Sequence, residues 1–369
     1  MLYRIGDIYA ERSERGAADM ELLSVTMNDG VIQRSEIEGK DNSSEDKSNY
    51  KVVRKGDMVY NSMRMWQGAN GVSPYDGIVS PAYTVLTAKL PICNEYFAAL
   101  FKNYKLINEF KKNSQGMTSD TWNLKYPQIK TIKVYLPRVT EQEKVASLIV
   151  TLDKRIAAQA TLVEQHKKYK RGLNRRLLSQ IEESYNCKLG SVCTIMGGGT
   201  PDTLHDEYWG NSVEWFTPSE IGKTKYVNSS VRKLSNEGLS NSSAKLLPAG
   251  TVLLTTRATL GEMSIAEKEC STNQGFQSLI PLMSRVSSEY LYYMQIIIKP
   301  WCEKYASGNT FREISKSALS ECIIPVPEKT QQDKIVKLLS AVDTLIAFEE
   351  KEASLLVQMK NSLLQQLFI

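Results

Sequence analysis

The most regular hydrophobic pattern in the chain lies in residues 139–181 and returns in residues 327–369. In both stretches apolar residues recur at alternating steps of four and three, which is the spacing of a coiled-coil seam. The first seam occupies positions 145, 149, 152, 156, 159, 163, 166, 170, 173 and 177. The second occupies positions 335, 339, 342, 346, 349, 353, 356, 360, 363 and 367. Both stretches are predicted to form long helices, and a helix of roughly 40 residues spans about 60 Å.

The two stretches are copies of one sequence. LPRVTEQEKVASLIVTLDKRI aligns without a gap on VPEKTQQDKIVKLLSAVDTLI, at an offset of 190 residues (327 − 137). The residues that recur are Pro137, Thr140, Gln142, Lys144, Leu148, Asp153, Ile156, Lys170, Leu173 and Leu177, matched by Pro327, Thr330, Gln332, Lys334, Leu338, Asp343, Ile346, Lys360, Leu363 and Leu367. The chain therefore contains an internal repeat.

Each copy opens with a proline and a Thr-x-x-acid segment, which predicts helix caps at Thr140 and Thr330. Each seam has polar residues at matching places, Gln159 and Lys170 in the first helix and Glu349 and Lys360 in the second. Polar residues on a seam can set the register of the paired helices. We expect a shared core formed by Leu152, Ile156, Val342 and Ile346. Two unrelated amphipathic helices, each packed on its own domain, are the alternative.

The segments outside the helices also repeat. KGDMVYNS from Lys55 is echoed by AGTVLLTT from Ala249, and EYFAAL from Glu95 by EYLYYM from Glu289. Short β-like runs such as Asp57–Asn61 and Tyr83–Leu86, with one helix from Glu95 to about Phe110, indicate an α+β fold. We predict four segments: a first α/β domain at 1–138, a helix at 139–184, a second α/β domain at 185–326, and a helix at 327–369.

The amino-acid composition limits the classes of function that the chain can have. The chain of 369 residues has 42% hydrophobic and 24% charged residues, as soluble globular proteins do, and its formal net charge of +5 permits a nucleic-acid partner. Its six cysteines form no C-x-x-C pair and it has two histidines, which disfavours a zinc site. Without a membrane-length apolar run or a signal-peptide pattern, we expect a cytoplasmic protein with reduced thiols and no membrane contact.

Motifs for DNA-modifying catalysis are not visible in the sequence. It has no Asn/Asp-Pro-Pro-aromatic loop of an amine methyltransferase, and the glycines Gly197–Gly199 are not followed by the lysine of a phosphate-binding loop. Pro201-Asp202 with Glu214 resembles a nuclease carboxylate pair, but Phe216 stands where its lysine belongs. We therefore predict no catalytic residues, no metal site and a binding function.

Several turn-like segments combine residues that hydrogen-bond base edges and phosphates or stack on bases. They occur at corresponding places in the two halves of the chain, which favours binding over the alternative that they are turns with inward-packed aromatic residues. The predicted DNA-binding residues are Arg64, Trp66, Gln67, Gln115, Thr118, Thr200, Arg257, Thr259, Asn273, Gln274, Asn309, Thr310 and Arg312.

These features resemble the specificity (S) subunit of type I restriction-modification systems. The resemblance rests on two α+β domains that are each followed by a helix opening in P-x-x-T-x-Q-x-K. It rests also on NSMR-x-WQG, SPAY and SQGMT in the first half and on GGGTP, TTRAT-x-G, TNQGF and SGNTF-x-EIS-x-S in the second. The first domain departs from the pattern, because Arg12–Gly16 stands where a GGTP-like segment is expected.

The resemblance implies two target-recognition domains that each read half of a bipartite, asymmetric DNA site, and an antiparallel coiled coil that sets the gap. It implies two methyltransferase subunits docked on the chain, and restriction subunits. S-adenosylmethionine, ATP and Mg would be bound by these partners and no cofactor by this chain. The alternatives are a methyltransferase or nuclease with an unrecognised active site, and a coiled-coil adaptor without a DNA role.

Overall fold

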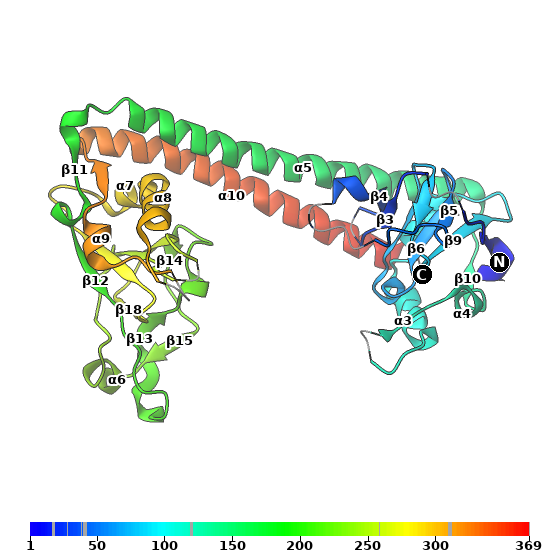
Figure 1. The fold of residues 1–369 in the computed structure, drawn as a ribbon, viewed down its shortest axis with the longest axis horizontal. Coiled ribbons are helices and arrows are strands. Elements are labelled where there is room, and N and C mark those ends of the chain that lie inside the picture. Colours follow the sequence, from blue (N-terminus) through cyan, green and yellow to red (C-terminus); the bar gives the residue numbers. More distant parts are fainter. Residues whose placement is uncertain are drawn as a thin grey trace. The chain divides into compact units, whose positions relative to one another are not determined.

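The structure is a computed structural model, and it describes residues 1–16, 19–27, 29–37, 39, 43–118, 121–257, 259–308 and 312–368. The chain forms two compact units. The first unit combines Met1–Thr161 with Glu350–Ile369, and the second unit is Leu162–Glu349. Each unit consists of mixed strands and short helices beside one part of each long helix, α5 and α10 (Figure 1).

The first unit contains a sheet with strand order β2-β9-β6-β7, in which all neighbours are antiparallel. A separate pair, β1 with β10, joins the start of the unit to the residues just before α5. The strands are β1 (Leu2–Arg4), β2 (Tyr9–Glu11), β3 (Leu23–Val25), β4 (Val31–Gln33), β5 (Lys51–Val53), β6 (Met58–Asn61), β7 (Asn70–Val72), β8 (Gly77–Val79), β9 (Tyr83–Ala88) and β10 (Lys133–Tyr135). The helices are α1 (Ile5–Ile8), η1 (Arg34–Glu36), η2 (Met65–Gln67), α2 (Asn94–Leu100), α3 (Tyr104–Asn113), α4 (Tyr126–Ile129) and the first part of α5 (Val139–Ser179).

The second unit has the sheet order β12-β19-β16-β17-β14, and the pair β11 with β20 next to its long helices. The strands are β11 (Asn186–Lys188), β12 (Cys193–Gly197), β13 (Trp209–Phe216), β14 (Tyr226–Val227), β15 (Arg232–Leu234), β16 (Val252–Leu254), β17 (Met263–Ala266), β18 (Cys270–Thr272), β19 (Gln277–Pro281) and β20 (Ile323–Pro325). The helices are η4 (Glu183–Tyr185), η5 (Leu189–Ser191), η6 (Asp206–Tyr208), η7 (Pro218–Glu220), α6 (Asn236–Ser240), α7 (Ser288–Tyr293), α8 (Gln295–Tyr305), α9 (Lys316–Ser320) and part of α10 (Lys329–Gln366).

The two units repeat one topology. The order β2-β9-β6-β7 in the first unit corresponds strand by strand to β12-β19-β16-β17 in the second. The terminal pairs β1-β10 and β11-β20 correspond as well. The α+β fold and the duplication predicted from the sequence are confirmed, including the strands expected near Asp57–Asn61 and Tyr83–Leu86.

The single helix expected from Glu95 to about Phe110 is two helices, so this prediction was wrong. The break lies at Phe101–Asn103, because Asn103 is extended and its side chain accepts a hydrogen bond from the backbone N–H of Lys105. An N-cap of this kind starts a new helix, α3, and ends the run of α2.

The long helices begin earlier than the predicted caps. Helix α5 begins at Val139, and the carboxylate of Glu141 accepts from the backbone N–H of Arg138 at 3.1 Å. Helix α10 begins at Lys329. Thr140 and Thr330 are therefore inside the first turn rather than at the cap, because their backbone is already helical.

The recurring glutamines of the P-x-x-T-x-Q segment tie each long helix to its unit. Gln142 and Gln332 are buried, and their side-chain N–H groups donate to the carbonyls of Pro137 at 2.9 Å and Pro327 at 2.8 Å. Their side-chain oxygens accept from the backbone N–H groups that precede α2 and α7, those of Cys93 and Ser287. A buried amide needs such partners, which explains why glutamine recurs.

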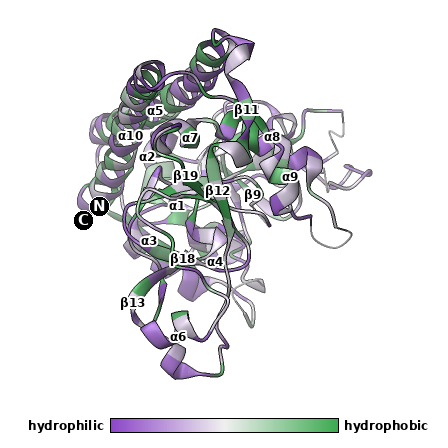
Figure 2. Cartoon of the chain, turned by 90° about the vertical axis from the view of Figure 1, so that its left-hand side faces the viewer, coloured by the Kyte–Doolittle hydropathy of each residue, from purple (hydrophilic) through white to green (hydrophobic). Residues whose placement is uncertain are grey.

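The helical seams are buried as their spacing predicted. Every seam position from Val145 to Leu177 in α5 is buried or half-buried, and so is every one from Ile335 to Leu363 in α10. Leu367 is 37% exposed because it follows the end of α10, and the neighbouring Leu364 and Phe368 pack into the first unit instead. Both helices carry hydrophilic and hydrophobic residues along their length in Figure 2.

The two helices run antiparallel within each unit. In the first unit Lys360 pairs with Asp153, and in the second Lys170 pairs with Asp343. The sequence repeat relates Asp153 to Asp343 and Lys360 to Lys170. The two ion pairs are therefore equivalent contacts in the two units. Leu152 and Ile156 lie in the first unit and Val342 and Ile346 in the second, so the shared core expected for these four residues stays a prediction.

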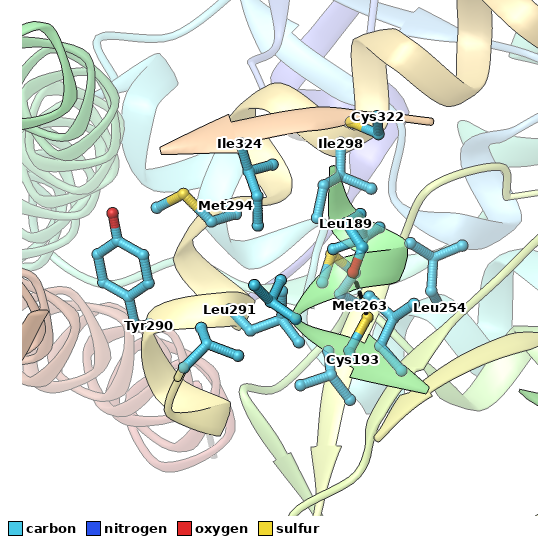
Figure 3. Packing of buried hydrophobic residues seen from close by; sticks show 14 of the residues in the cluster. Leu189, Cys193, Leu254, Met263, Tyr290, Leu291, Met294, Ile298, Cys322 and Ile324 are labelled. Carbon is cyan, nitrogen blue, oxygen red and sulfur yellow. Dashed lines mark hydrogen bonds between the residues drawn. The ribbon is translucent and has the colours of Figure 1, made fainter. Parts of the chain in front are cut away.

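The largest core lies in the second unit and joins its sheet, α7, α8 and the helix ends. Figure 3 shows Leu254 and Met263 of the sheet facing Leu291 of α7, Ile298 of α8 and Met294 between these helices. All six cysteines are free, and four of them, Cys193, Cys270, Cys302 and Cys322, are buried. Burial raises the pKa of these four thiols to about 12, so they act as small apolar side chains.

Candidate functional site

Two loops meet on the surface of the first unit, and together they form the first loop cluster (residues 61–68, 114–118 and 121–124). The first loop follows β6 and contains η2, and the second follows α3. The backbone N–H of Leu124 donates to the carbonyl of Ser62 at 2.8 Å, and the rings of Trp66 and Trp122 meet edge to face at 5.2 Å. The tertiary structure thus brings together segments that are 50 residues apart in the sequence (115 against 65).

Side chains of the first loop cluster present donors and acceptors at the surface. Arg64 is exposed and donates to the side-chain oxygen of Gln67 at 3.3 Å, while Trp66 donates through its indole N–H to the carbonyl of Met63. Gln115 and Thr118 are also exposed. The ammonium group of Lys111 lies 5.9 Å from the Trp66 ring, which adds a positive charge that the sequence analysis did not include.

Four loops meet in the second unit and form the second loop cluster (residues 198–201, 255–257, 259, 272–275, 307–308 and 312–313). Thr200 donates its hydroxyl to the side-chain oxygen of Gln274 at 2.5 Å. The backbone N–H of Thr256 donates to the carbonyl of Gly275, and Glu313 accepts from Thr256 and Arg257. Hydrogen bonds therefore connect all four segments that the sequence analysis selected.

The predicted residues in this cluster differ in how they are held. Arg257 is exposed and its guanidinium lies 2.8 Å from Glu313, while Asn273 accepts from the backbone N–H of Gly275 through its side-chain oxygen. Arg312 donates to the carbonyl of Glu303, so its guanidinium also supports the end of α8. Thr259 and Gln274 are exposed. Asn309 and Thr310 lie outside the described residues.

Gly198 and Gly199 allow the β12 end to approach two other segments closely. A Cβ on Gly198 would lie 2.2 Å from the carbonyl oxygen of Asn273, and one on Gly199 would lie 2.2 Å from Oγ of Ser243. The backbone N–H of Gly199 already donates to the carbonyl of Thr272. These glycines are thus needed for packing, and the amide of Gly199 is not free to hold a phosphate.

Gly198→Ala is expected to lower the free energy of unfolding of the second unit by about 1 to 3 kcal/mol, because the methyl group meets backbone atoms that must move. Thermal unfolding of the full chain measures this effect. Gly197→Ala is the control, because its Cβ would lie 3.8 Å from the nearest atom. Equal melting temperatures for the two variants would show that the loop adapts without cost.

One aromatic and cationic group beside the second loop cluster was missed in the sequence. The indole N–H of Trp215 on β13 donates to the carbonyl of Gly199, and Trp215 meets Trp209 edge to face at 5.1 Å. The guanidinium of Arg232 on β15 stacks 3.4 Å above the Trp209 ring. The sequence could have indicated the aromatic pair, because both tryptophans lie on one strand. The pairing of β13 with β15, which brings Arg232 to Trp209, follows only from the fold.

The carboxylates considered for nuclease chemistry have structural partners. Glu214 accepts from the backbone N–H and the hydroxyl of Ser230 and lies 2.7 Å from the ammonium of Lys233. Burial opposes ionisation of Glu214, but the hydrogen bonds from Lys233 and Ser230 outweigh it and lower the pKa of the carboxyl. Asp202 accepts from the backbone N–H of Leu204. The contacts of Glu214 thus join β13 to the residues around β15.

In the first unit Arg12, at the place of the missing GGTP-like segment, has a structural role. Its guanidinium donates twice to the Asp57 carboxylate, at 2.8 and 3.1 Å, which raises the pKa of Arg12. The residues after β2 are therefore held against the start of β6.

Across the described ranges, no helix is both long enough and apolar enough to cross a membrane.

Comparisons with known proteins agree with this architecture. The MjaIX specificity subunit of Methanocaldococcus jannaschii is 35% identical over 186 residues, covering 49% of this chain and 43% of that protein. The chain thus spans less than half of that relative's length in the alignment. The putative MjaX specificity subunit of the same organism is 23% identical over 355 residues, covering 89% of this chain and 81% of the relative.

The fold is also that of a solved protein. The type I restriction-modification system S subunit from M. genitalium has a TM-score of 0.57 and 16% identity, with 100% of this chain and 96% of that chain covered. The family model described as the type I restriction modification DNA specificity domain matches residues 4–165 and again residues 181–357. Since the two matches span most of the sequence, the chain belongs to the type I restriction-modification DNA specificity family.

Proposed function

We propose that this chain is the DNA sequence-recognition subunit of a type I restriction-modification complex and has no catalytic centre of its own. The observation that carries the proposal is the pair of loop clusters, because each duplicated unit gathers donor, acceptor and aromatic residues from distant segments in one loop cluster. Family membership supports the same assignment. Each unit reads one half of a bipartite, asymmetric site.

Base edges and phosphates are contacted by different kinds of side chain in this proposal. Arg64, Gln67 and Gln115 in the first loop cluster, and Arg257 and Asn273 in the second, match the hydrogen-bonding patterns of guanine and adenine edges. Asn309 and Arg312 belong to the proposed reading set as well. Trp66, Thr118, Thr200, Thr259, Gln274 and Thr310 are proposed to position the duplex through backbone contacts or stacking.

The partners supply the chemistry. Two methyltransferase subunits would dock on the chain and bind S-adenosylmethionine, and restriction subunits would bind ATP and Mg. This chain would bind no cofactor, and the assembly would work in the cytoplasm. Helices α5 and α10 are the proposed spacer and docking elements, because their outer faces keep exposed apolar residues such as Leu148 and Leu338.

The direct test compares the purified chain with the assembled complex. We expect the chain alone to bind DNA weakly and to transfer no methyl group from S-adenosylmethionine, while the complex methylates adenines at one bipartite sequence. Site-specific methylation by the purified chain alone would instead identify a methyltransferase. A complex whose DNA affinity is absent at every salt concentration would identify an adaptor, since DNA binding through phosphates depends on salt.

Arg257→Ala is expected to weaken specific binding by the complex by about 1 to 3 kcal/mol and to relax one base of the target, because a base-reading guanidinium is lost. Equal weakening for all sequences would instead assign Arg257 to a phosphate. Binding titrations against single-base variants of the target measure both outcomes. Lys188→Ala is the control, because Lys188 pairs with Glu321 at 2.6 Å outside the second loop cluster.

A further inference from the structure

A pocket of about 240 Å³ lies in the first unit between α2, β7, the start of β4 and the adjoining parts of α5 and α10. Its walls include Ala98 and Ala99 of α2, Val150 and Asp153 of α5, and Lys360 of α10. Lys102 also lines it and donates to the carbonyl of Met27. Burial, and then the charge of Lys360, lower the pKa of Lys102. The lining of the pocket therefore combines charged and polar side chains with small and apolar ones.

The sequence repeat identifies what occupies the same place in the second unit. NEYFAAL of α2 aligns with SEYLYYM, which is α7 and the residue after it, so Ala98 and Ala99 correspond to Tyr292 and Tyr293. The helix repeat relates Val150, Asp153 and Lys360 to Ser340, Asp343 and Lys170, respectively. The pocket thus lies where the second unit has two tyrosine side chains.

Tyr293 shows how an aromatic ring fits these surroundings. It is 2% exposed, and its hydroxyl donates to the Asp343 carboxylate at 2.6 Å and lies 2.9 Å from Oγ of Ser340. The Lys170 ammonium lies 5.4 Å from the centre of the ring. Burial and the nearby Asp343 carboxylate raise the pKa of Tyr293, so its phenol remains a hydrogen-bond donor.

We propose that the pocket of the first unit binds a single aromatic ring that carries a hydroxyl group, with the hydroxyl donating to Asp153 and the ring lying beside the Lys360 ammonium. Asp153 and Lys360 already pair as Asp343 and Lys170 do around Tyr293. The space is sufficient, because a cavity of about 150 Å³ holds a benzene ring. This site is separate from the first loop cluster and does not depend on the proposed DNA function.

The test uses the full chain and 4-methylphenol (p-cresol) as the probe, with binding followed by calorimetry and by saturation-transfer NMR. We expect one saturable site that prefers p-cresol to toluene by about tenfold or more, because toluene leaves the carboxylate without its donor. Asp153→Asn should reduce this preference.

N-acetyltyrosine amide is tested in parallel, because its binding would show that the pocket also admits a tyrosine on a polypeptide, whereas binding of p-cresol alone identifies a free phenol.

Two variants locate the site. Ala99→Tyr places the missing ring in the pocket and should abolish p-cresol binding, while Ala82→Tyr adds the same side chain at an exposed loop position and should leave binding unchanged. Tyr293→Ala should open the equivalent space in the second unit and create a second site, visible in calorimetry as a second equivalent of bound p-cresol. The proposal is overturned if the unaltered chain shows no saturable binding, if toluene binds equally well, or if Ala99→Tyr folds and still binds.

Discussion

Replacing residues 186–326 with the corresponding domain of another specificity subunit is expected to change one half of the methylated DNA site and to leave the other half unchanged. The replaced segment begins with β11 and ends just after β20, and these two strands pair with each other. The inserted segment therefore contains both strands of the pair that joins its two ends, those equivalent to β11 and β20. The first loop cluster is not altered, so the half-site that it reads should persist.

The swap succeeds only if the inserted domain keeps its contacts with the helices. Ser287 donates to Gln332 through its backbone N–H, and Tyr293 donates to Asp343. Lys225 donates to Ser340 and lies 4.7 Å from the Tyr293 ring. The donor domain should therefore carry a tyrosine at the place of Tyr293 and a lysine at that of Lys225, or it will dock poorly for reasons unrelated to DNA.

Mapping methylated adenines in cells that carry the complete system measures the outcome. A parallel variant with one helical turn inserted in both α5 and α10 should lengthen the gap between the half-sites while keeping both sequences. Half-sites read from one face of B-DNA tend to lie about 10 base pairs apart, centre to centre. If the swap changes both half-sites together, the two loop clusters read DNA as one surface and the modular proposal fails.

Leu152→Asp is expected to lower the free energy of unfolding of the first unit by about 3 to 5 kcal/mol. Leu152 is 6% exposed, so the substitution removes buried apolar surface and leaves a carboxylate without a partner. The new charge would also lie next in sequence to Asp153, whose carboxylate pairs with Lys360. Urea unfolding together with hydrogen exchange in α2 and α10 locates the loss in the first unit.

Leu148→Asp provides the control for this experiment, since Leu148 lies on the same helix but is 46% exposed. A surface change of this kind usually alters stability by no more than about 0.5 kcal/mol. Equal effects of the two substitutions would mean that the buried seam does not stabilise the unit. A loss confined to the assembled complex would support the proposed docking role of Leu148.

The sequence by itself determined the duplication, the two long helices and the buried seam. These features are periodic, and a period of three to four residues specifies a helical face wherever the chain folds. The sequence also selected the loop segments that the structure brings together in the two clusters, because glycine, asparagine and arginine gather there, and their contact with DNA stays a prediction. The caps expected at Thr140 and Thr330 lie inside the helices, since the cap depends on backbone angles that the Thr-x-x-acid pattern does not determine.

Only the tertiary structure decided which segments meet. The stack of Arg232 on Trp209, the pairing of Arg257 with Glu313 and the pocket beside Ala99 all join residues that are distant in the sequence. The same holds for the break between α2 and α3, because Asn103 is fixed by α10, to whose Leu364 carbonyl its side chain donates at 3.0 Å. Local patterns encode faces and turns, but partners across the fold follow from strand order and helix register, which short-range spacing does not specify.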